Sequence, residues 1–239
     1  MRCIIVLLAW LASNALTLGA DAAKPADFAS AMAPIMANLR TAASYARTGN
    51  IALAQMETDE AVAAWKRLEP NASIPLPVYA PAVLSDFLDR GRERLTAATR
   101  ALDSGDTVAA GRELLALRQS LHELRIRAGL YDLGDCVFEI APAMEKLRVA
   151  ATRYGEQPAP ANAEDTVAAA GAFRDRLQRC NEWASAEIAK TSEFRRLIDG
   201  AIASSGAIAH AAMAGDGPLV HRYLIELQSY AQLLDFRFG

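Results

Sequence analysis

The sequence predicts an all-α protein built as two tandem antiparallel four-helix bundles. Apolar residues recur at i, i+3, i+4 and i+7 along most of the chain, which is typical of amphipathic helices. Glycine followed by Asn or Asp interrupts this pattern, and such pairs end one helix and cap the next. A segment near the N-terminus also recurs in the second half of the chain. Together these features indicate one helical unit present twice.

Composition limits the classes of function. The 239 residues are 52% hydrophobic and 22% charged, with a net charge of −3. This balance excludes an intrinsically disordered chain. It also provides no excess of positive charge for a nucleic acid, so nucleic acid is excluded as the expected partner.

The N-terminal residues predict a secretory signal peptide. Arg2 precedes nine apolar residues, Ile4 to Ala12, and Ala20-Asp21-Ala22 supplies a cleavage site of the A-x-A type. Nine residues are too few to cross a bilayer, which needs about 20. We therefore expect residues 1–22 to be removed, leaving a soluble periplasmic or secreted protein with no membrane span.

The first half of the mature chain contains four helical patterns. Thr48-Gly49-Asn50 and Ser104-Gly105-Asp106 separate consecutive helices, and four prolines between residues 69 and 81 indicate a long connection. The predicted helices are Phe28–Arg47, Asn50–Leu68, Val83–Leu102 and Thr107–Arg127.

The second half repeats the first. Residues 33–44 and 141–152 share seven of twelve amino acids, and Gly105-Asp106 recurs at Gly215-Asp216. We interpret this as an internal duplication, with bundles at 23–130 and 131–239. The predicted helices of the second bundle are Cys136–Tyr154, Ala163–Lys190, Glu193–Met213 and Leu219–Phe238.

Cys136 and Cys180 are the two cysteines left after removal of the signal peptide. They lie at equal distances from the proline-containing break near residue 158, so antiparallel helices would bring them together. In an oxidising compartment this predicts a disulfide. Two buried free thiols are the alternative, and a metal site is less favoured because no histidine lies nearby.

The last two helices of each unit resemble cytochrome c prime and its low-spin relatives, exported four-helix bundles with a similar turn. Ser104-Gly105-Asp106 and Ala214-Gly215-Asp216 match that turn. The family attaches haem through Cys-x-x-Cys-His near the end of the fourth helix. Here the corresponding positions are 121–125 and 231–235, which contain neither cysteines nor the axial histidine. The resemblance therefore implies the fold, and the sequence excludes covalent haem.

A few residues are candidates for other ligands. In the low-spin relatives a first-helix methionine binds iron, and Met36 and Met144 lie in a comparable region. His210 and His221 flank the turn that contains Asp216, and together these three could bind a metal; a solvated hairpin end is the alternative. Methionine thioethers favour Cu(I), but methionines at helical spacing are also common core residues. His122 is predicted to lie on the surface.

No catalytic motif is visible: the sequence contains no glycine-rich phosphate loop and no metalloprotease motif. We therefore expect no enzyme and no resident cofactor, but a protein that binds a periplasmic partner protein or a small apolar ligand, in a redox or respiratory setting. The alternative is a carrier of copper, another metal or non-covalent haem, with Met36, Met144 and the two hairpin histidines as ligands.

Overall fold

The computed structural model describes residues 26–68, 80–127 and 129–239, and these confirm the all-α prediction. They contain helices and no β-strand. No helix among them is long and apolar enough to span a membrane. The predicted signal peptide, residues 1–22, lies outside the described part of the chain. The helices are α1 (Ala26–Arg47), α2 (Ile51–Leu68), α3 (Pro81–Asp103), α4 (Thr107–Arg127), α5 (Leu133–Phe138), α6 (Ile140–Glu156), α7 (Pro160–Trp183), the short 3₁₀ helix η2 (Ile188–Lys190), α8 (Ser192–Met213) and α9 (Gly217–Phe238).

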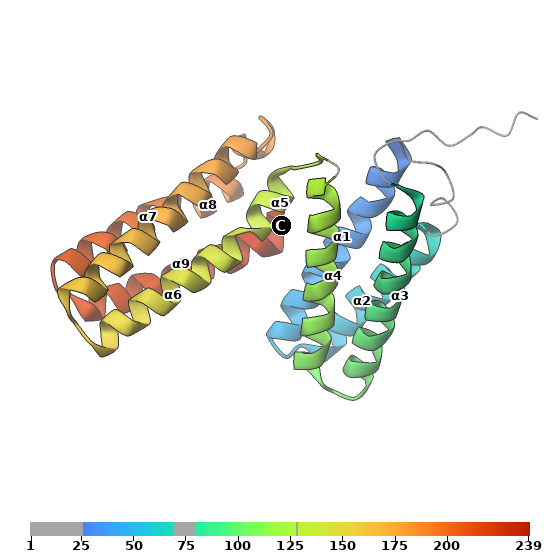
Figure 1. Ribbon diagram of the computed structural model, residues 1–239, viewed down its shortest axis with the longest axis horizontal. Coiled ribbons are helices and arrows are strands. Elements are labelled where there is room, and N and C mark those ends of the chain that lie inside the picture. The colour runs from blue at the N-terminus through green and yellow to red at the C-terminus, as the bar shows by residue number, and fades with distance from the viewer. Residues whose placement is uncertain (1–25, 69–79, 128) are drawn as a thin grey trace, which may run out of the picture.

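The long helices lie in two groups that follow one another along the chain. Helices α1–α4 form the first group and α6–α9 the second, while α5 and the end of α9 lie between them (Figure 1). Within each group every helix packs against two others, in the order of a closed ring.

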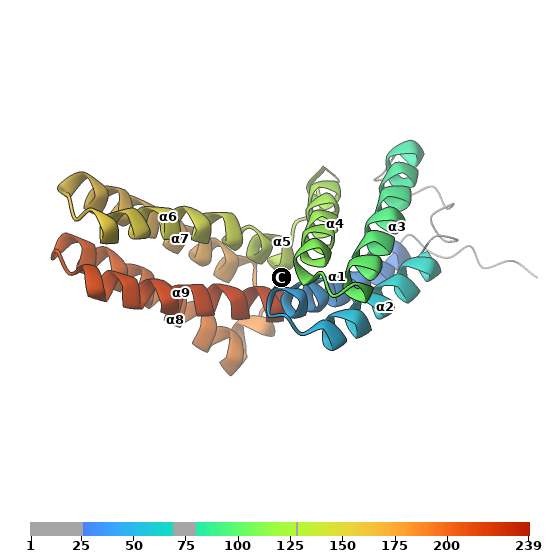
Figure 2. The same ribbon diagram turned by 90° about the horizontal axis from the view of Figure 1, so that it is seen from below.

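The two groups differ in how their hairpins meet. Figure 2 shows α6–α9 running side by side, whereas the α3–α4 hairpin crosses the direction of the α1–α2 hairpin. The crossing leaves α2 and α3 with a smaller contact than α1 has with α2.

Each group has its own hydrophobic core. The buried apolar residues of 133–234 form one cluster, and those of 32–124 form two clusters within the first group. The largest fully buried side chains include Trp65 and Leu39 in the first group and Phe173 and Phe194 in the second. Burial of these apolar stripes is the main source of stability for helices of this length.

Buried positions correspond between the two groups. Along α3–α4 and α8–α9, an offset of 110 pairs one buried residue with another at twelve positions. The pairs are Leu84/Phe194, Phe87/Leu197, Leu88/Ile198, Gly91/Ala201, Leu95/Ser205, Ala98/Ile208, Leu102/Ala212, Ala110/Val220, Leu114/Leu224, Leu117/Leu227, Leu121/Ala231 and Leu124/Leu234.

The turns at 104–106 and 214–216 have the same geometry, as the sequence predicted. Gly105 and Gly215 adopt φ of 79° and 78°, a left-handed conformation that favours glycine. Asp106 accepts a hydrogen bond from the Ala109 backbone N–H at 2.8 Å, and Asp216 accepts one from Leu219 at 2.9 Å. The two aspartates are therefore N-caps of α4 and α9.

Two predicted helices of the second half differ from the structure. The first begins at Leu133, not Cys136, because Asp132 and Asp135 form a capping box that starts the short helix α5, and the helix is interrupted at Glu139. The helix predicted to reach Lys190 ends at Trp183. Beyond it the Ser185 hydroxyl accepts a hydrogen bond from the Ile188 N–H, which competes with continuation of the helix.

Candidate functional site

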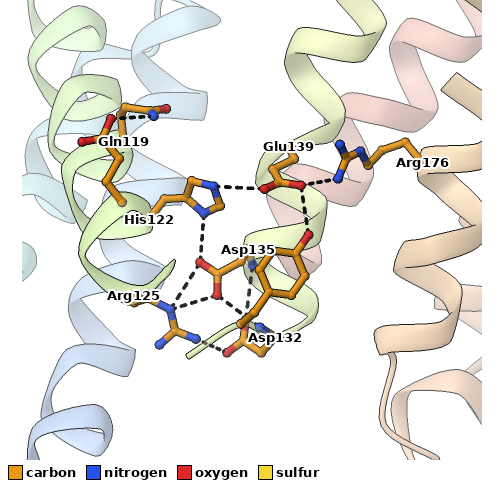
Figure 3. Close-up of polar contacts among 9 residues, drawn as sticks. Gln119, His122, Arg125, Asp132, Asp135, Glu139 and Arg176 are labelled. Carbon is orange, nitrogen blue, oxygen red and sulfur yellow. Dashed lines mark hydrogen bonds and ion pairs between the residues drawn. The ribbon is translucent and has the colours of Figure 1, made fainter. Parts of the chain in front are cut away.

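A cluster of charged side chains joins the two groups of helices (Figure 3). His122 of α4 lies between two carboxylates of the segment that leads into the second group, Asp135 of α5 and Glu139 directly after it. Its Nδ1 is 3.0 Å from Asp135 Oδ1, and its Nε2 is 3.3 Å from Glu139 Oε1. The side chain of His122 is only 12% exposed, so the prediction of a surface histidine is wrong. Nothing in the local sequence shows this, since the burial comes from residues that follow α4.

Asp135 is the most buried member of this cluster, with a side chain 2% exposed. As the third residue of α5 it accepts a hydrogen bond from the Asp132 N–H, and Asp132 accepts one from the Asp135 N–H, both at 3.2 Å. Arg125 of α4 donates to Asp135 Oδ2 at 3.0 Å and also to Asp132. The two aspartates that cap α5 therefore also bind Arg125 of α4, and this ties α4 to α5 at the junction.

The carboxylate of Glu139 accepts hydrogen bonds from two other side chains. It accepts a hydrogen bond from the Tyr131 hydroxyl at 2.9 Å and pairs with Arg176 of α7. Burial, reinforced by the hydrogen bond to Glu139, raises the pKa of Tyr131 to about 12. Tyr131 therefore stays a neutral donor at ordinary pH.

A second contact links α4 and α1 to the end of α9. Arg118 donates to both oxygens of Asp235, at 3.1 and 2.7 Å, and its guanidinium lies 5.0 Å from the ring centre of Phe138. Arg40 of α1 donates to the backbone carbonyl of Gly239. Burial, together with repulsion by Arg118, lowers the pKa of Arg40 from its usual value. These buried arginines orient the two groups relative to one another.

The candidate metal ligands at the hairpin do not form a site in the described structure. His210, His221 and Asp216 are all exposed, and the carboxylate of Asp216 caps α9. Among the described residues, no three His, Cys, Asp or Glu side chains gather in a way that could hold a metal ion.

Met36 and Met144 occupy equivalent positions but different surroundings. Met36 is half-buried and lines a small cavity at the junction together with His122 and Arg118. Met144 is buried in the core of the second group. At the positions where the family would carry haem thiols, Leu121 and Leu124 are buried apolar residues, so these positions do not fit a covalent haem.

Cys136 and Cys180 lie at the distance of a disulfide bond, in agreement with the sequence prediction. Their sulfur atoms are 2.14 Å apart and their Cα atoms 5.4 Å apart. Both residues are fully buried. The pair links α5 to α7 and so holds the helix that carries Asp135 against the second group.

A hollow lies at the end of the second group that is formed by its two interhelical turns. Its volume is about 720 Å³, within the range of small-molecule sites, and its lining is mainly apolar. Tyr154, Val167 and Met213 line its sides, with Pro158, Ala159, Pro160, Ala163, Glu164, Ala168, Ala212 and Gly215 completing the wall. We call it the tip hollow.

The tip hollow arises from a difference in helix length. Leu39 corresponds to Leu147 at an offset of 108, but Trp65 corresponds to Leu177 at an offset of 112. The α6–α7 hairpin thus has four more residues than α1–α2, one at the end of α6 and three at the start of α7, which adds about 1.5 Å and about 4.5 Å of helix. The α8–α9 turn has no such insertion, so the longer hairpin extends past it and leaves an apolar recess.

The equivalent positions in the first group carry a polar pair. Gln55 and Asp103 correspond to Val167 and Met213, and Gln55 Nε2 donates to Asp103 Oδ1 at 3.3 Å. In the second group these positions are apolar, and Met213 is 64% exposed. The sequence signal for this difference is the change of offset across the first hairpin, from 108 at Leu39 to 112 at Trp65.

Comparisons with known protein families, with curated proteins and with solved structures found no match for this chain. The chain's own residues offer three features: the charged junction, the disulfide-distance pair and the tip hollow. The junction residues form hydrogen bonds and ion pairs with one another, whereas the tip hollow presents apolar surface to solvent.

Proposed function

We propose that this chain is an exported, non-enzymatic binding protein, a haem-free relative of cytochrome c prime, that takes up a small apolar ligand in the tip hollow. The proposal has three parts: export, descent from a duplicated four-helix bundle, and binding. Export is supported by the signal-peptide pattern of residues 1–22 and by the fully buried Cys136 and Cys180 at disulfide distance.

Two features support tandem four-helix bundles at 23–130 and 131–239. The core positions of α3–α4 and α8–α9 correspond at a constant offset, and the Gly-Asp turns at Gly105 and Gly215 share their backbone geometry. Separate hydrophobic cores also favour two units over one interleaved domain. The resemblance to cytochrome c prime lies in those turns and the helix order.

The observation that carries the binding proposal is the apolar lining of the tip hollow, where the first group carries the polar pair Gln55 and Asp103 at corresponding positions. Water in contact with the apolar wall of an empty recess is unfavourable. Binding of an apolar molecule removes that surface from water and so lowers the free energy. Val167 and Met213 replace a hydrogen-bonded polar pair, so the second unit exposes apolar surface where the first does not.

The test is binding of N-phenyl-1-naphthylamine, an uncharged probe that fluoresces in apolar surroundings. We expect saturable binding with one site per chain. The double variant Val167→Gln, Met213→Asp, which copies the residues of the first group, should weaken binding by about tenfold or more because it introduces polar groups into the recess.

The matched control makes the same chemical changes elsewhere. Val108 and Leu115 are exposed residues of α4, so Val108→Gln with Leu115→Asp should leave probe binding unchanged. Equal binding by all three proteins would overturn the proposal. The absorbance spectrum of the same preparation tests the alternative carrier function: a Soret band or bound copper would replace apolar-ligand binding as the role.

A further inference from the structure

One carboxylate lies in the wall of the tip hollow, at the end of the second group that points away from the first (Figure 1). Among the described residues that line the hollow, Glu164 is the charged one, and none is Lys or Arg. The other lining residues are Tyr, Pro, Ala, Val, Met and Gly. An apolar recess with a single fixed charge selects among ligands by the charge that they carry.

Glu164 lies in the middle of the face that α7 presents to the hollow. Pro160 lies one helical turn before it, and Val167 and Ala168 lie one turn after it, and all of them line the hollow. Residues at this spacing are neighbours, with about 5–6 Å between their Cβ atoms. The apolar surface beside Glu164 is also accessible, since Met213 is 64% exposed and Val167 is half-buried. One small molecule can therefore contact both the carboxylate and the apolar wall.

The Glu164 carboxylate is free to pair with a ligand. It is exposed and forms no hydrogen bond or ion pair with another described residue. An arginine of the same hairpin, Arg153 of α6, pairs with Asp165 at 3.6 Å. Adjacent positions of a helix do not share a face, so this pair lies on a different side of α7 from the hollow. The negative charge of Glu164 is therefore not balanced by that arginine.

The first group has no counterpart of this carboxylate. At the offset of 112 that relates α2 to α7, Glu164 corresponds to Ala52. Thr58 and Ala170, which are both fully buried, support this register. The common core pattern of the two groups therefore does not explain Glu164. Within the described chain, the carboxylate occurs together with the apolar lining at Val167, in the second group.

We propose that the ligand of the tip hollow is an organic ammonium ion, with its apolar body on Val167 and Met213 and its charged nitrogen at the Glu164 carboxylate. This inference rests on the proposed function and names the chemical class of the ligand. The apolar contact supplies most of the free energy of binding, and the ion pair selects a cation over a neutral or anionic molecule of the same shape.

Three naphthalene compounds with one apolar body and different charges test the proposal by titration calorimetry. They are 1-naphthylmethylammonium, 1-naphthylmethanol and 1-naphthylacetate. We expect the ammonium ion to bind about threefold to fivefold more tightly than the alcohol, the effect of one exposed ion pair, and the acetate to bind most weakly. Added salt should reduce the preference for the cation, because the Glu164 carboxylate is exposed.

Variants of Glu164 separate the charge from the apolar contact. Glu164→Gln should bind the ammonium ion and the alcohol equally, with the alcohol at its parent affinity, and Glu164→Lys should favour the acetate over the ammonium ion. The matched control is Glu182→Gln, which removes an exposed carboxylate of the same helix about 27 Å away and should leave the preference unchanged. Val167→Gln should weaken the ammonium ion and the alcohol to the same degree.

Failure of this inference is distinguishable from failure of the proposed function. Equal affinity for the ammonium ion and the alcohol, or an unchanged preference in Glu164→Gln, would overturn the cation assignment while leaving an apolar site in place. A cation that binds without displacing N-phenyl-1-naphthylamine would overturn it as well, because it would bind outside the tip hollow. Absence of binding by the alcohol, the ammonium ion and N-phenyl-1-naphthylamine would overturn both.

Discussion

The cysteine pair makes a quantitative prediction about stability. Cys136 and Cys180 are separated by 44 residues. On the chain-entropy account, a cross-link closing a loop of this length lowers the entropy of the unfolded chain enough to stabilise the fold by about 4 kcal/mol at 25 °C. Native-state strain and residual structure in the unfolded chain reduce such values, so we expect between about 2 and 4 kcal/mol.

The assay is urea unfolding followed by circular dichroism at 222 nm, with and without a reductant. The perturbation is Cys136→Ala with Cys180→Ala, which removes the link and leaves small apolar side chains in a fully buried site. The oxidised parent should unfold at higher urea than the variant, and with a smaller m-value because its unfolded state exposes less surface. Reductant present during unfolding should lower the urea midpoint of the parent toward that of the variant and leave the midpoint of the variant unchanged.

Thiol counting decides between a disulfide and two buried thiols. The unfolded, unreduced protein without its signal peptide should react with no thiol reagent, and after reduction it should react at two positions. Two reactive thiols before reduction, together with a urea midpoint insensitive to reductant, would refute the reasoning.

Three further predictions concern the junction and the core. Asp135→Asn should destabilise the fold by about 3 kcal/mol in urea unfolding, because it leaves the largely buried Arg125 without the negative charge that it pairs with; a loss below 0.5 kcal/mol, on the order of an exposed ion pair, would contradict this. Gly91→Ala should cost about 3 kcal/mol, because the new methyl group meets the Trp65 ring at 2.0 Å, whereas Gly206→Ala, with open space around its Cβ position, should stabilise α8 by up to about 1 kcal/mol. The pKa of Tyr131, raised by burial from 10.0 to about 12, means that this phenol favours the fold below pH 10 and loses that contribution as pH rises toward 12. Since Tyr131 is partly exposed, the stability difference between the parent and Tyr131→Phe should shrink by about 1 kcal/mol over that interval, and a constant difference would argue against it.

Local sequence signals determined most helix ends. Gly105 and Asp106 mark a turn because glycine adopts the left-handed conformation and aspartate caps the next helix, and both effects act within a few residues. The pairing of Cys136 with Cys180 was also predictable, since two antiparallel helices joined by a short turn place equidistant residues opposite one another.

The junction was not predictable in the same way. His122 has a polar neighbourhood in sequence, and its burial depends on Asp135 and Glu139, which reach it only after the chain turns back at α5. Tertiary contacts of this kind leave little trace in helical periodicity. The start of α5 at Leu133 was missed for a local reason: Asp132 and Asp135 form a capping box, a pattern of two acidic residues that differs from the usual Ser/Thr and Glu pair.

The tip hollow bears on function because of where the two groups of helices differ. Exposed residues vary freely, so a difference between Gln55 and Val167 carries no weight alone. This difference coincides with a hollow in the surface: Val167 and Met213 are apolar and line the recess, whereas Gln55 and Asp103 at the corresponding positions of the first group are polar and hydrogen-bonded to each other. The coincidence of an apolar exchange with a recess is the reason for placing the proposed ligand there.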